Sequence, residues 1–172
     1  MFDALKRHPF AVEAFFRRSL VLAYAVPRDV LDDLIGPGLE LDTYGDWGFL
    51  AIALVQTEGL RPRGFPSWMG SDFFLSGYRI FTRFARSGHP PLRGLRILRS
   101  DTDRFVMARL GNLFTHYNYC RARVAMNVDE ERLEIVIRTP AGEADLHVIA
   151  DLASSPAPLP AGSPFRSMED AR

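Results

Sequence analysis

Two segments of the sequence carry arginine and glutamate where apolar stretches turn polar. GFLAIALVQTEGLRPRG ends with Glu58 and Arg61, and YRIFTRF contains Arg79 and Arg83. A guanidinium can bind both oxygens of a carboxylate or stabilise an enolate, and a glutamate can transfer a proton. These residues predict a site for a small organic acid, with Arg79 in mid-strand as the main anion-binding group. The alternative is a structural ion pair, because such networks also stabilise folds.

A third segment, LFTHYNYCRARVAM, adds histidine, asparagine and tyrosines. If it forms one strand, His116 and Asn118 share a face about 6.6 Å apart and can bind one ligand, while Tyr117 and Tyr119 lie on the other face. His116 and Cys120 would be about 13 Å apart, too far for a catalytic dyad. A histidine held by ordinary hydrogen bonds is the alternative interpretation.

The sequence thus gives two groups of candidate site residues. Proton transfer is assigned to the catalytic candidates Glu58 and His116. Substrate binding is assigned to Arg61, Arg79, Arg83, Tyr78, Tyr117, Asn118 and Tyr119. The scattered histidines lack the spacing of a zinc site, and there is no glycine-rich phosphate motif, so neither a metal nor a cofactor is predicted.

The composition narrows the class of protein. The chain has 172 residues and a formal net charge of zero, from 21 basic and 21 acidic residues. No global field therefore attracts nucleic acid, and no apolar segment is long enough for a membrane span. The single cysteine, Cys120, excludes an internal disulfide. We expect a soluble, cytoplasmic protein that binds a small molecule, with homo-oligomer formation left open.

Hairpin-scale spacing of apolar segments predicts a mostly β, α+β domain built as an antiparallel β-barrel with one or two short helices. Residues 1–152 are assigned to this domain, and residues 153–172 to a Pro/Ala/Ser-rich tail in which Ser167 begins a helix that the end of the chain cuts off. Strands are expected at 19–26, on both sides of a hairpin turn at 44–46, at 72–86, at 92–103, and three more times after residue 113. Helices are expected within 3–18, at 27–38 and at 104–112.

The loop at 60–71 is rich in proline and glycine and carries Phe65, Trp68 and Met69. Aromatic side chains fill volume, and a barrel needs to be closed at its ends. We expect this loop to plug one end of the barrel. A lid or a partner-binding surface is the alternative.

Several segments occur in an order typical of one family. They are VPRDVLDDLIGPGLELDTYGDWGFLAIAL, GLRPRGFP, YRIFTRF, RILRSDTD and LFTHYNYCRARVAM. Over residues 15–150 the chain resembles the YqjF-like family of uncharacterised bacterial proteins, in the acetoacetate-decarboxylase-like fold group. Arg79 matches an arginine position of the family, whereas Ala23-Tyr24 departs from its usual aromatic pair. The resemblance implies a cone-like β-barrel around an interior cavity, without implying a known reaction.

The namesake of that fold group works through a Schiff-base lysine. This chain has one lysine, Lys6, outside every predicted strand, and arginine cannot form a Schiff base. Decarboxylation by that route is therefore excluded. The expected function is small-molecule binding, with a lyase or isomerase acting on a small organic or keto acid as the enzymatic version. A non-catalytic ligand-binding module and an assembly module are the alternatives.

Overall fold

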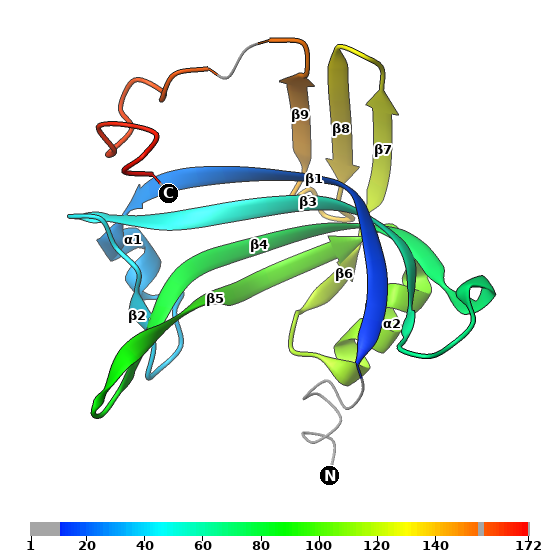
Figure 1. Cartoon of the computed structure of the whole chain (residues 1–172), viewed down its shortest axis with the longest axis horizontal. Coiled ribbons are helices and arrows are strands. Elements are labelled where there is room, and N and C mark those ends of the chain that lie inside the picture. The colour runs from blue at the N-terminus through cyan, green and yellow to red at the C-terminus, as the bar shows by residue number, and fades with distance from the viewer. Residues whose placement is uncertain (1–10, 155–156, 172) are drawn as a thin grey trace.

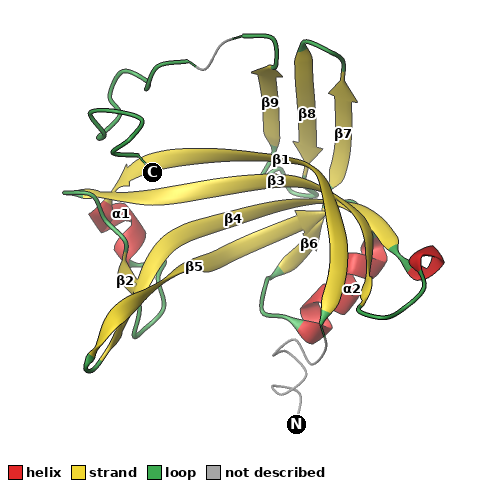
Figure 2. Cartoon of the chain, viewed as in Figure 1, coloured by secondary structure: helices red, strands yellow, loops and turns green. Residues whose placement is uncertain are grey.

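The structure is a computed structural model that describes residues 11–154 and 157–171, and two β-sheets make up most of this part of the chain (Figures 1 and 2). Within these residues the larger sheet has six strands, in the order β1-β3-β4-β5-β6, and β2 pairs separately with β4. The strands are β1 (Val12–Pro27), β2 (Glu40–Leu41), β3 (Trp47–Pro62), β4 (Ser71–Arg86), β5 (His89–Thr102) and β6 (Tyr119–Arg121). The β5–β6 pair is parallel and the other pairs are antiparallel.

The smaller sheet contains β7 (Arg123–Val128), β8 (Arg132–Arg138) and β9 (Leu146–Asp151), all antiparallel. It packs against one face of the larger sheet. Ile135 and Ile137 of β8 are buried there against Leu54 of β3 and Phe74 of β4. Alternate residues of a strand point to opposite faces, so this contact covers one face of the large sheet, and every second side chain of β3 and β4 points to the opposite face.

Two helices and one short turn complete the described elements. The helix α1 (Arg28–Asp32) buries Leu31 in a second, smaller apolar cluster with Leu41 and Ile80. The helix α2 (Phe105–Phe114) follows β5 and places Gly111 against Tyr119 of β6. A 3-10 turn, η2 (Ser67–Met69), lies between β3 and β4. In the described residues, no helix combines the length and apolar character that a bilayer crossing requires.

One residue carries the chain from the large sheet to the small one. Arg121 ends β6 and Arg123 begins β7, with only Ala122 between them. Ala122 is 4% exposed, belongs to the core between the sheets, and donates its backbone N–H to the carbonyl of Thr102 at 2.9 Å. The crossover is therefore fixed by both packing and hydrogen bonding.

The predicted mostly β, α+β class with two short helices is confirmed. The predicted closure into a barrel is not confirmed. In the described part of the chain, β1 and β6 remain the two edges of the large sheet, and no strand pairing joins the two sheets. The three-residue β6 pairs only with β5, so the curvature of the large sheet is not completed by a β1–β6 ladder among these residues.

The helix predicted within residues 3–18 is wrong for the part that the structure describes; residues 1–10 lie outside it. From Val12 the chain is strand, because β1 gains a ladder with β3 along its whole length, and such tertiary pairing overrides local preference. The helix at 27–38 is shorter than predicted, ending at Asp32. The predicted helix start at Ser167 is a turn, in which the Ser167 hydroxyl accepts the Asp170 N–H at 3.2 Å.

The continuous strand predicted over residues 113–126 is also wrong. The helix α2 continues to Phe114, where the Thr115 hydroxyl donates to the Gly111 carbonyl at 2.8 Å. Asn118 has a left-handed φ of 51°, which asparagine tolerates better than most residues and which interrupts a strand. The shared face assigned to His116 and Asn118 therefore does not exist. At the predicted 44–46 hairpin, only an isolated Tyr44–Trp47 bridge forms, and β2 pairs with β4 instead.

Candidate functional site

The face of the large sheet opposite the small sheet carries Arg79. In the strand register, Ala23 pairs with Ala51, and Ala51 with Arg79. The neighbouring pair on this face is Ala53 with Gly77. On β3 the partners of this face are therefore small, whereas the partner of Arg79 on β5 is Ile97.

Gly77 makes room for the Arg79 side chain. A Cβ placed on Gly77 would lie 3.0 Å from the Nε atom of Arg79 and 3.1 Å from its Nη2 atom. The backbone of Gly77 is not in the left-handed region, so conformational freedom does not explain this glycine. The glycine is explained by the space that the Arg79 guanidinium occupies above it.

The Arg79 guanidinium is incompletely satisfied. Its Nε atom is buried and has no hydrogen-bond partner among the described residues. Among residues 11–154 and 157–171, no carboxylate oxygen lies within 4.0 Å of the Arg79 guanidinium nitrogens, the limit for an ion pair. A buried, unpaired donor on a cation costs free energy, commonly several kcal/mol for the charge. A bound anion would supply the missing acceptor.

Tyr119 reaches the same face from β6. It is 8% exposed, and the side chain of Asn112 fixes its backbone by donating to its carbonyl at 2.8 Å and accepting its N–H at 2.7 Å. Burial raises the pKa of the Tyr119 phenol to about 12; Tyr117 raises it further, while the positive charge of Arg79 opposes the shift. At neutral pH the phenol is therefore protonated and can donate a hydrogen bond beside the guanidinium.

Tyr117 completes the group that we call the Arg79 site, defined as Arg79, Tyr117 and Tyr119. The rings of Tyr117 and Tyr119 have centroids 6.1 Å apart and are tilted by 46°. A guanidinium beside a neutral phenol can bind a carboxylate and can stabilise the oxygen of an enolate. Of the predicted binding residues, these are the three that the structure brings together.

Glu58 does not join this group. It binds Arg17 of β1 at 2.9 Å, and it follows Ala51 by seven residues, which places it on the opposite face of β3 from the side that carries Arg79. Glu58 therefore forms an ion pair, but with Arg17 rather than with Arg79 or Arg83. Sequence reasoning missed Arg17 because it lay within the predicted N-terminal helix.

The other two predicted arginines make ion pairs of their own. Arg61 binds Glu13 of β1 at 3.1 Å and donates to the Gly59 carbonyl at 3.0 Å. Arg83 binds Asp42, with an Nε–Oδ1 distance of 2.7 Å, and Arg93 binds the second oxygen of the same carboxylate at 2.9 Å. Both contacts match the structural alternative, an ion pair at the edge of the fold.

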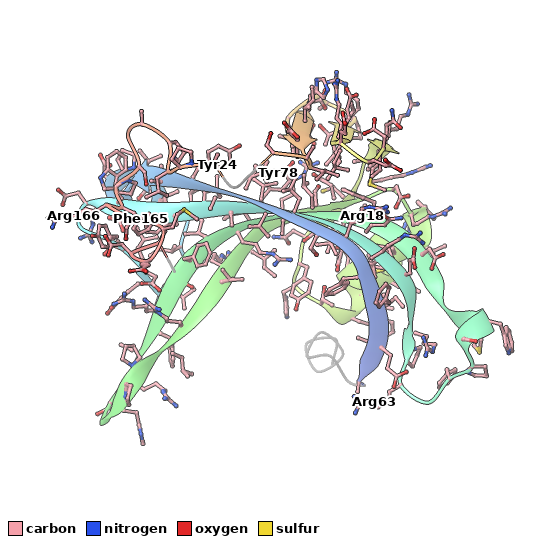
Figure 3. All side chains as sticks on the ribbon, turned by 45° about the horizontal axis from the view of Figure 1, so that its top comes forward. Arg18, Tyr24, Arg63, Tyr78, Phe165 and Arg166 are labelled. Carbon is pink, nitrogen blue, oxygen red and sulfur yellow. The ribbon has the colours of Figure 1, made fainter. Side chains whose placement is uncertain are left out.

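Tyr78, His116 and Asn118 also lie apart from the Arg79 site. Tyr78 is on the core face, where its hydroxyl donates to the Ala144 carbonyl of the β8–β9 loop at 3.1 Å, and Figure 3 shows it beneath the small sheet. His116 is exposed in the loop before β6. The Asn118 side chain donates to the Leu98 carbonyl at 3.1 Å and so fixes that loop.

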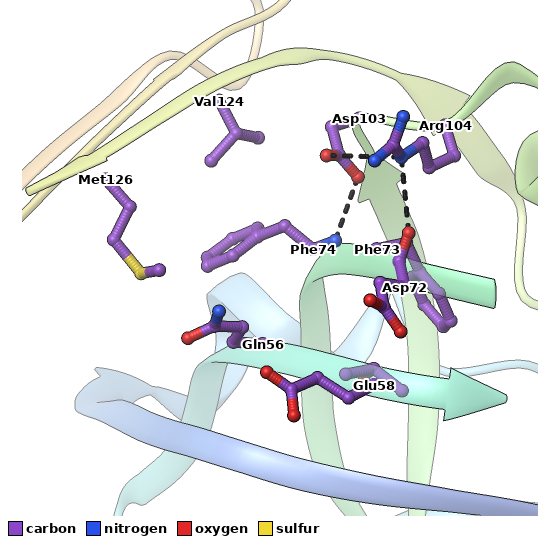
Figure 4. Close-up of a pocket in the computed structure, with 10 residues that line it drawn as sticks. Gln56, Glu58, Asp72, Phe73, Phe74, Asp103, Arg104, Val124 and Met126 are labelled. Carbon is purple, nitrogen blue, oxygen red and sulfur yellow. Dashed lines mark hydrogen bonds and ion pairs between the residues drawn. The ribbon is translucent and has the colours of Figure 1, made fainter. Parts of the chain in front are cut away.

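A pocket of about 220 Å³ contains Glu58, and Figure 4 shows its lining. The other charged side chains of this pocket already have hydrogen-bond partners. Asp72 accepts the Gly59 N–H at 2.7 Å, Asp103 accepts the Phe74 N–H at 2.8 Å, and Arg104 donates to the Asp72 carbonyl at 3.2 Å. These contacts join the ends of β3, β4 and β5. The pocket therefore resembles a structural junction more than a ligand site.

A buried polar cluster between the sheets was missed from the sequence, where residues 92–103 were expected only as a strand. Asp101 of β5 is 1% exposed and binds Arg99 at 2.6 Å, and Arg99 also binds Glu143 at 2.8 Å. Burial raises the pKa of the Asp101 carboxyl group, although Arg99 opposes the shift. Within the described residues, no group of three or more histidine, cysteine or acidic side chains is arranged to hold a metal.

The exposed loop after β3 does not plug an end of the fold. Trp68 is 81% exposed, and Phe65 and Met69 are also exposed. The predicted plug is therefore wrong: the loop projects from the sheet, and its aromatic side chains fill no interior volume. A lid or a partner-binding surface, the alternative from the sequence, stays open.

The fold is similar to that of a solved acetoacetate decarboxylase from Legionella pneumophila subsp. pneumophila str. Philadelphia 1. The TM-score is 0.62 at 18% sequence identity, and the match covers 86% of this chain and 52% of the decarboxylase chain. This chain thus spans about half the length of that structure. A comparison with curated protein sequences gives no match.

A family model agrees with the resemblance seen in the sequence. The model for DUF2071, described as "Uncharacterized conserved protein (COG2071)", matches residues 13–167. This match includes both sheets, apart from the first residue of β1, and every residue of the Arg79 site. The chain belongs to the DUF2071 family of uncharacterised conserved proteins.

Proposed function

We propose that this protein binds a small organic acid or keto acid at the Arg79 site. The observation that carries the proposal is the buried Nε atom of Arg79, which has no acceptor among the described residues. The other arginines predicted for the site, Arg61 and Arg83, already have carboxylate partners. Arg79 therefore differs from them in needing an acceptor from outside the described chain.

The surroundings of Arg79 leave its guanidinium without a competing acceptor. Its register partners are Ala51 on β3 and Ile97 on β5, and neither carries an acceptor side chain. The Tyr119 phenol, protonated because its pKa is raised to about 12, adds a hydrogen-bond donor. A carboxylate or an enolate matches two donors of this kind, whereas a cation or a purely apolar ligand does not.

Binding without catalysis is the form of the proposal with the most support. A lyase or isomerase would need a group that exchanges protons near neutral pH. Glu58 is engaged with Arg17, and His116 lies in the exposed loop before β6. If a reaction occurs, Tyr119 is the candidate proton donor to an enolate that Arg79 stabilises. A cytoplasmic location is part of the same proposal and is supported by the composition alone.

Titration calorimetry with acetate, pyruvate and acetoacetate tests the proposal. Charge-assisted hydrogen bonds contribute about 1.5–3 kcal/mol each, so Arg79→Gln should weaken binding by roughly tenfold or more. Arg86→Gln is the matched control, because Arg86 is an exposed arginine of the same strand that donates to the Pro90 carbonyl. Equal affinity of the wild-type protein and Arg79→Gln for these acids, or no binding at all, would remove the proposal.

Assembly is a second candidate function, and the exposed loop after β3 is the observation that favours it. Trp68 is 81% exposed, with Phe65 and Met69 beside it on the same loop. Exposed apolar groups of this kind often mark contacts between proteins. Sedimentation velocity on wild-type protein and Trp68→Ser tests this function: an oligomer that dissociates in the variant supports it, and a monomer in both contradicts it.

A further inference from the structure

A second pocket lies where β6 passes into β7, beside the end of β8. Its volume is about 510 Å³. The lining residues come from the crossover and from the start of the β8–β9 loop: Arg121, Ala122, Arg123, Arg138, Thr139 and Pro140. We call it the arginine pocket. It shares no residue with the Arg79 site.

Two of its arginines face each other across a strand pair. Arg123 of β7 is the register partner of Arg138 of β8. Like charges directly opposite each other in an antiparallel pair destabilise a sheet. Both side chains are exposed, so this arrangement does not serve packing in the core. The Arg123–Arg138 pair therefore lowers the stability of the sheet, and no packing contact in the core accounts for its presence.

A third guanidinium adds to the same charge. Arg121 precedes Arg123 by two residues, and Ala122 between them is buried in the core, so both arginines point away from the core. Arg138 binds Asp145 at 3.0 Å. Among the described residues, no carboxylate lies within 4.0 Å of Arg121 or Arg123. The pocket thus concentrates positive charge in a chain whose net charge is zero.

At the other end of the small sheet, an exposed arginine has an acidic partner. Arg132 of β8 has Glu134 at 3.4 Å, and His147 of β9 has the same glutamate at 2.7 Å. There, basic groups are balanced by an acidic neighbour on the sheet. At the arginine pocket, Asp145 balances Arg138 in this way, whereas Arg121 and Arg123 have no such neighbour among the described residues.

We propose that the arginine pocket binds a phosphorylated small molecule. A monocarboxylate satisfies one guanidinium, whereas a phosphate or diphosphate group offers several anionic oxygens to three of them. The volume of the pocket leaves space for more than the phosphate group itself. The Thr139 side chain is held in place by Asp145 and by the Ala144 N–H, so the wall beside the guanidinium groups is fixed. This inference does not depend on the Arg79 site.

The test is titration calorimetry of the full chain with inorganic phosphate, inorganic pyrophosphate and glycerol 3-phosphate. Saturable binding of glycerol 3-phosphate or pyrophosphate is expected, with an affinity that falls as salt is added. Arg123→Gln should weaken it by about tenfold or more. Arg132→Gln, which removes an exposed arginine of the same sheet that has an acidic partner, should bind like the wild-type protein.

A charge reversal separates a binding role from a structural one. Arg123→Glu places a carboxylate opposite Arg138, so it should raise the melting temperature while abolishing phosphate binding. A lower melting temperature would mean that Arg123 supports the fold, and would overturn the proposal. Absence of binding at millimolar concentrations, or equal binding by wild-type protein and Arg123→Gln, would also overturn it. Tighter binding of free phosphate than of the ester would overturn the assignment to a phosphorylated molecule.

Discussion

The Tyr119 ring lies directly against Gly111. A Cβ on this glycine would stand 2.3 Å from the Cδ2 atom of the tyrosine and 2.5 Å from Cε2. Real contacts are never so short, and the tyrosine cannot retreat easily because Asn112 holds its backbone on both sides. The absence of a side chain at position 111 therefore determines where the Tyr119 phenol lies relative to Arg79.

Gly111→Ala should consequently destabilise the protein, although alanine is the better helix former. Overpacking of this kind costs about 1–3 kcal/mol, which exceeds the gain of about 1 kcal/mol from helix propensity. Urea denaturation measures the free energy of unfolding. Gly36→Ala is the control, since a Cβ there meets no atom within 4 Å. An increase in stability for Gly111→Ala would show that Tyr119 can move away.

Gly77→Ala should act on binding more than on stability. The added methyl group would stand 3.0 Å from the Arg79 Nε atom, at the flexible end of a side chain that can shift away. We expect a loss of affinity for small acids of roughly tenfold, since a displaced guanidinium loses its aligned hydrogen bonds. Gly94→Ala, in the neighbouring strand β5 with nothing within 4 Å, should bind normally. Equal affinities of the two variants would contradict the described position of Arg79.

Asp101 predicts a particular dependence of stability on pH. Burial raises the pKa of its carboxyl group above the unfolded value of 3.8, so the folded state holds the proton more strongly. This contribution to stability is complete below the unfolded pKa and is lost as the pH rises through the folded pKa. Relative to Asp101→Asn, the wild-type protein should therefore lose free energy of unfolding across that window and then level off.

The measurement for Asp101 is a series of urea denaturations from about pH 3 to pH 8 on both proteins. Other carboxyl groups titrate in the same range, including Asp145, whose pKa is lowered by its hydrogen bond to the Thr139 backbone. The effects of groups that contact neither Asp101 nor Arg99 are common to the two proteins and cancel in the difference. A difference that does not change with pH would mean that burial does not raise the pKa of Asp101.

The tail residue Phe165 should attach the C-terminal segment to the large sheet. Its ring stacks on Phe49 of β3, with centroids 5.2 Å apart and an interplanar angle of 10°, and lies 5.0 Å from Tyr44. Figure 3 shows Phe165 and Arg63 at opposite ends of β3. Phe165→Ala should cost about 1 kcal/mol and speed proteolysis of the tail, because aromatic pairs add about 0.5–1.5 kcal/mol. Met168→Ala, at an exposed position, should do neither.

Strand-level patterns in the sequence predicted much of the fold. Apolar and β-branched runs predicted most of β3, β4 and β5, and alternation placed Arg79 and Tyr78 on opposite faces, as observed. The N-terminal half of β1 was missed because its residues also suit a helix, and only pairing with β3 decides between the two. Barrel closure depends on contacts between distant edges, which local patterns do not record.

The candidate site was predictable only in part, for a similar reason. The sequence shows that Arg79 is in mid-strand, but not that Glu58 pairs with an arginine 41 residues earlier. Gly77 precedes Arg79 by two residues, a spacing that suggests nothing until the guanidinium is seen above it. Tyr117 and Tyr119 were selected from a strand that does not exist, yet the turn at Asn118 still brings them together. The catalytic roles of Glu58 and His116, a cytoplasmic location and homo-oligomer formation stay predictions.

The single-residue passage through Ala122 has a mechanical consequence. A loop between β6 and β7 would absorb small displacements, but here one buried alanine, bonded to Thr102, joins Tyr119 and Arg121 on one side to Arg123 on the other. Because the connection is one residue long, the last residue of β6 and the first residue of β7 keep a fixed spacing. A displacement of β6 would carry the start of β7 with it, which a longer loop would prevent.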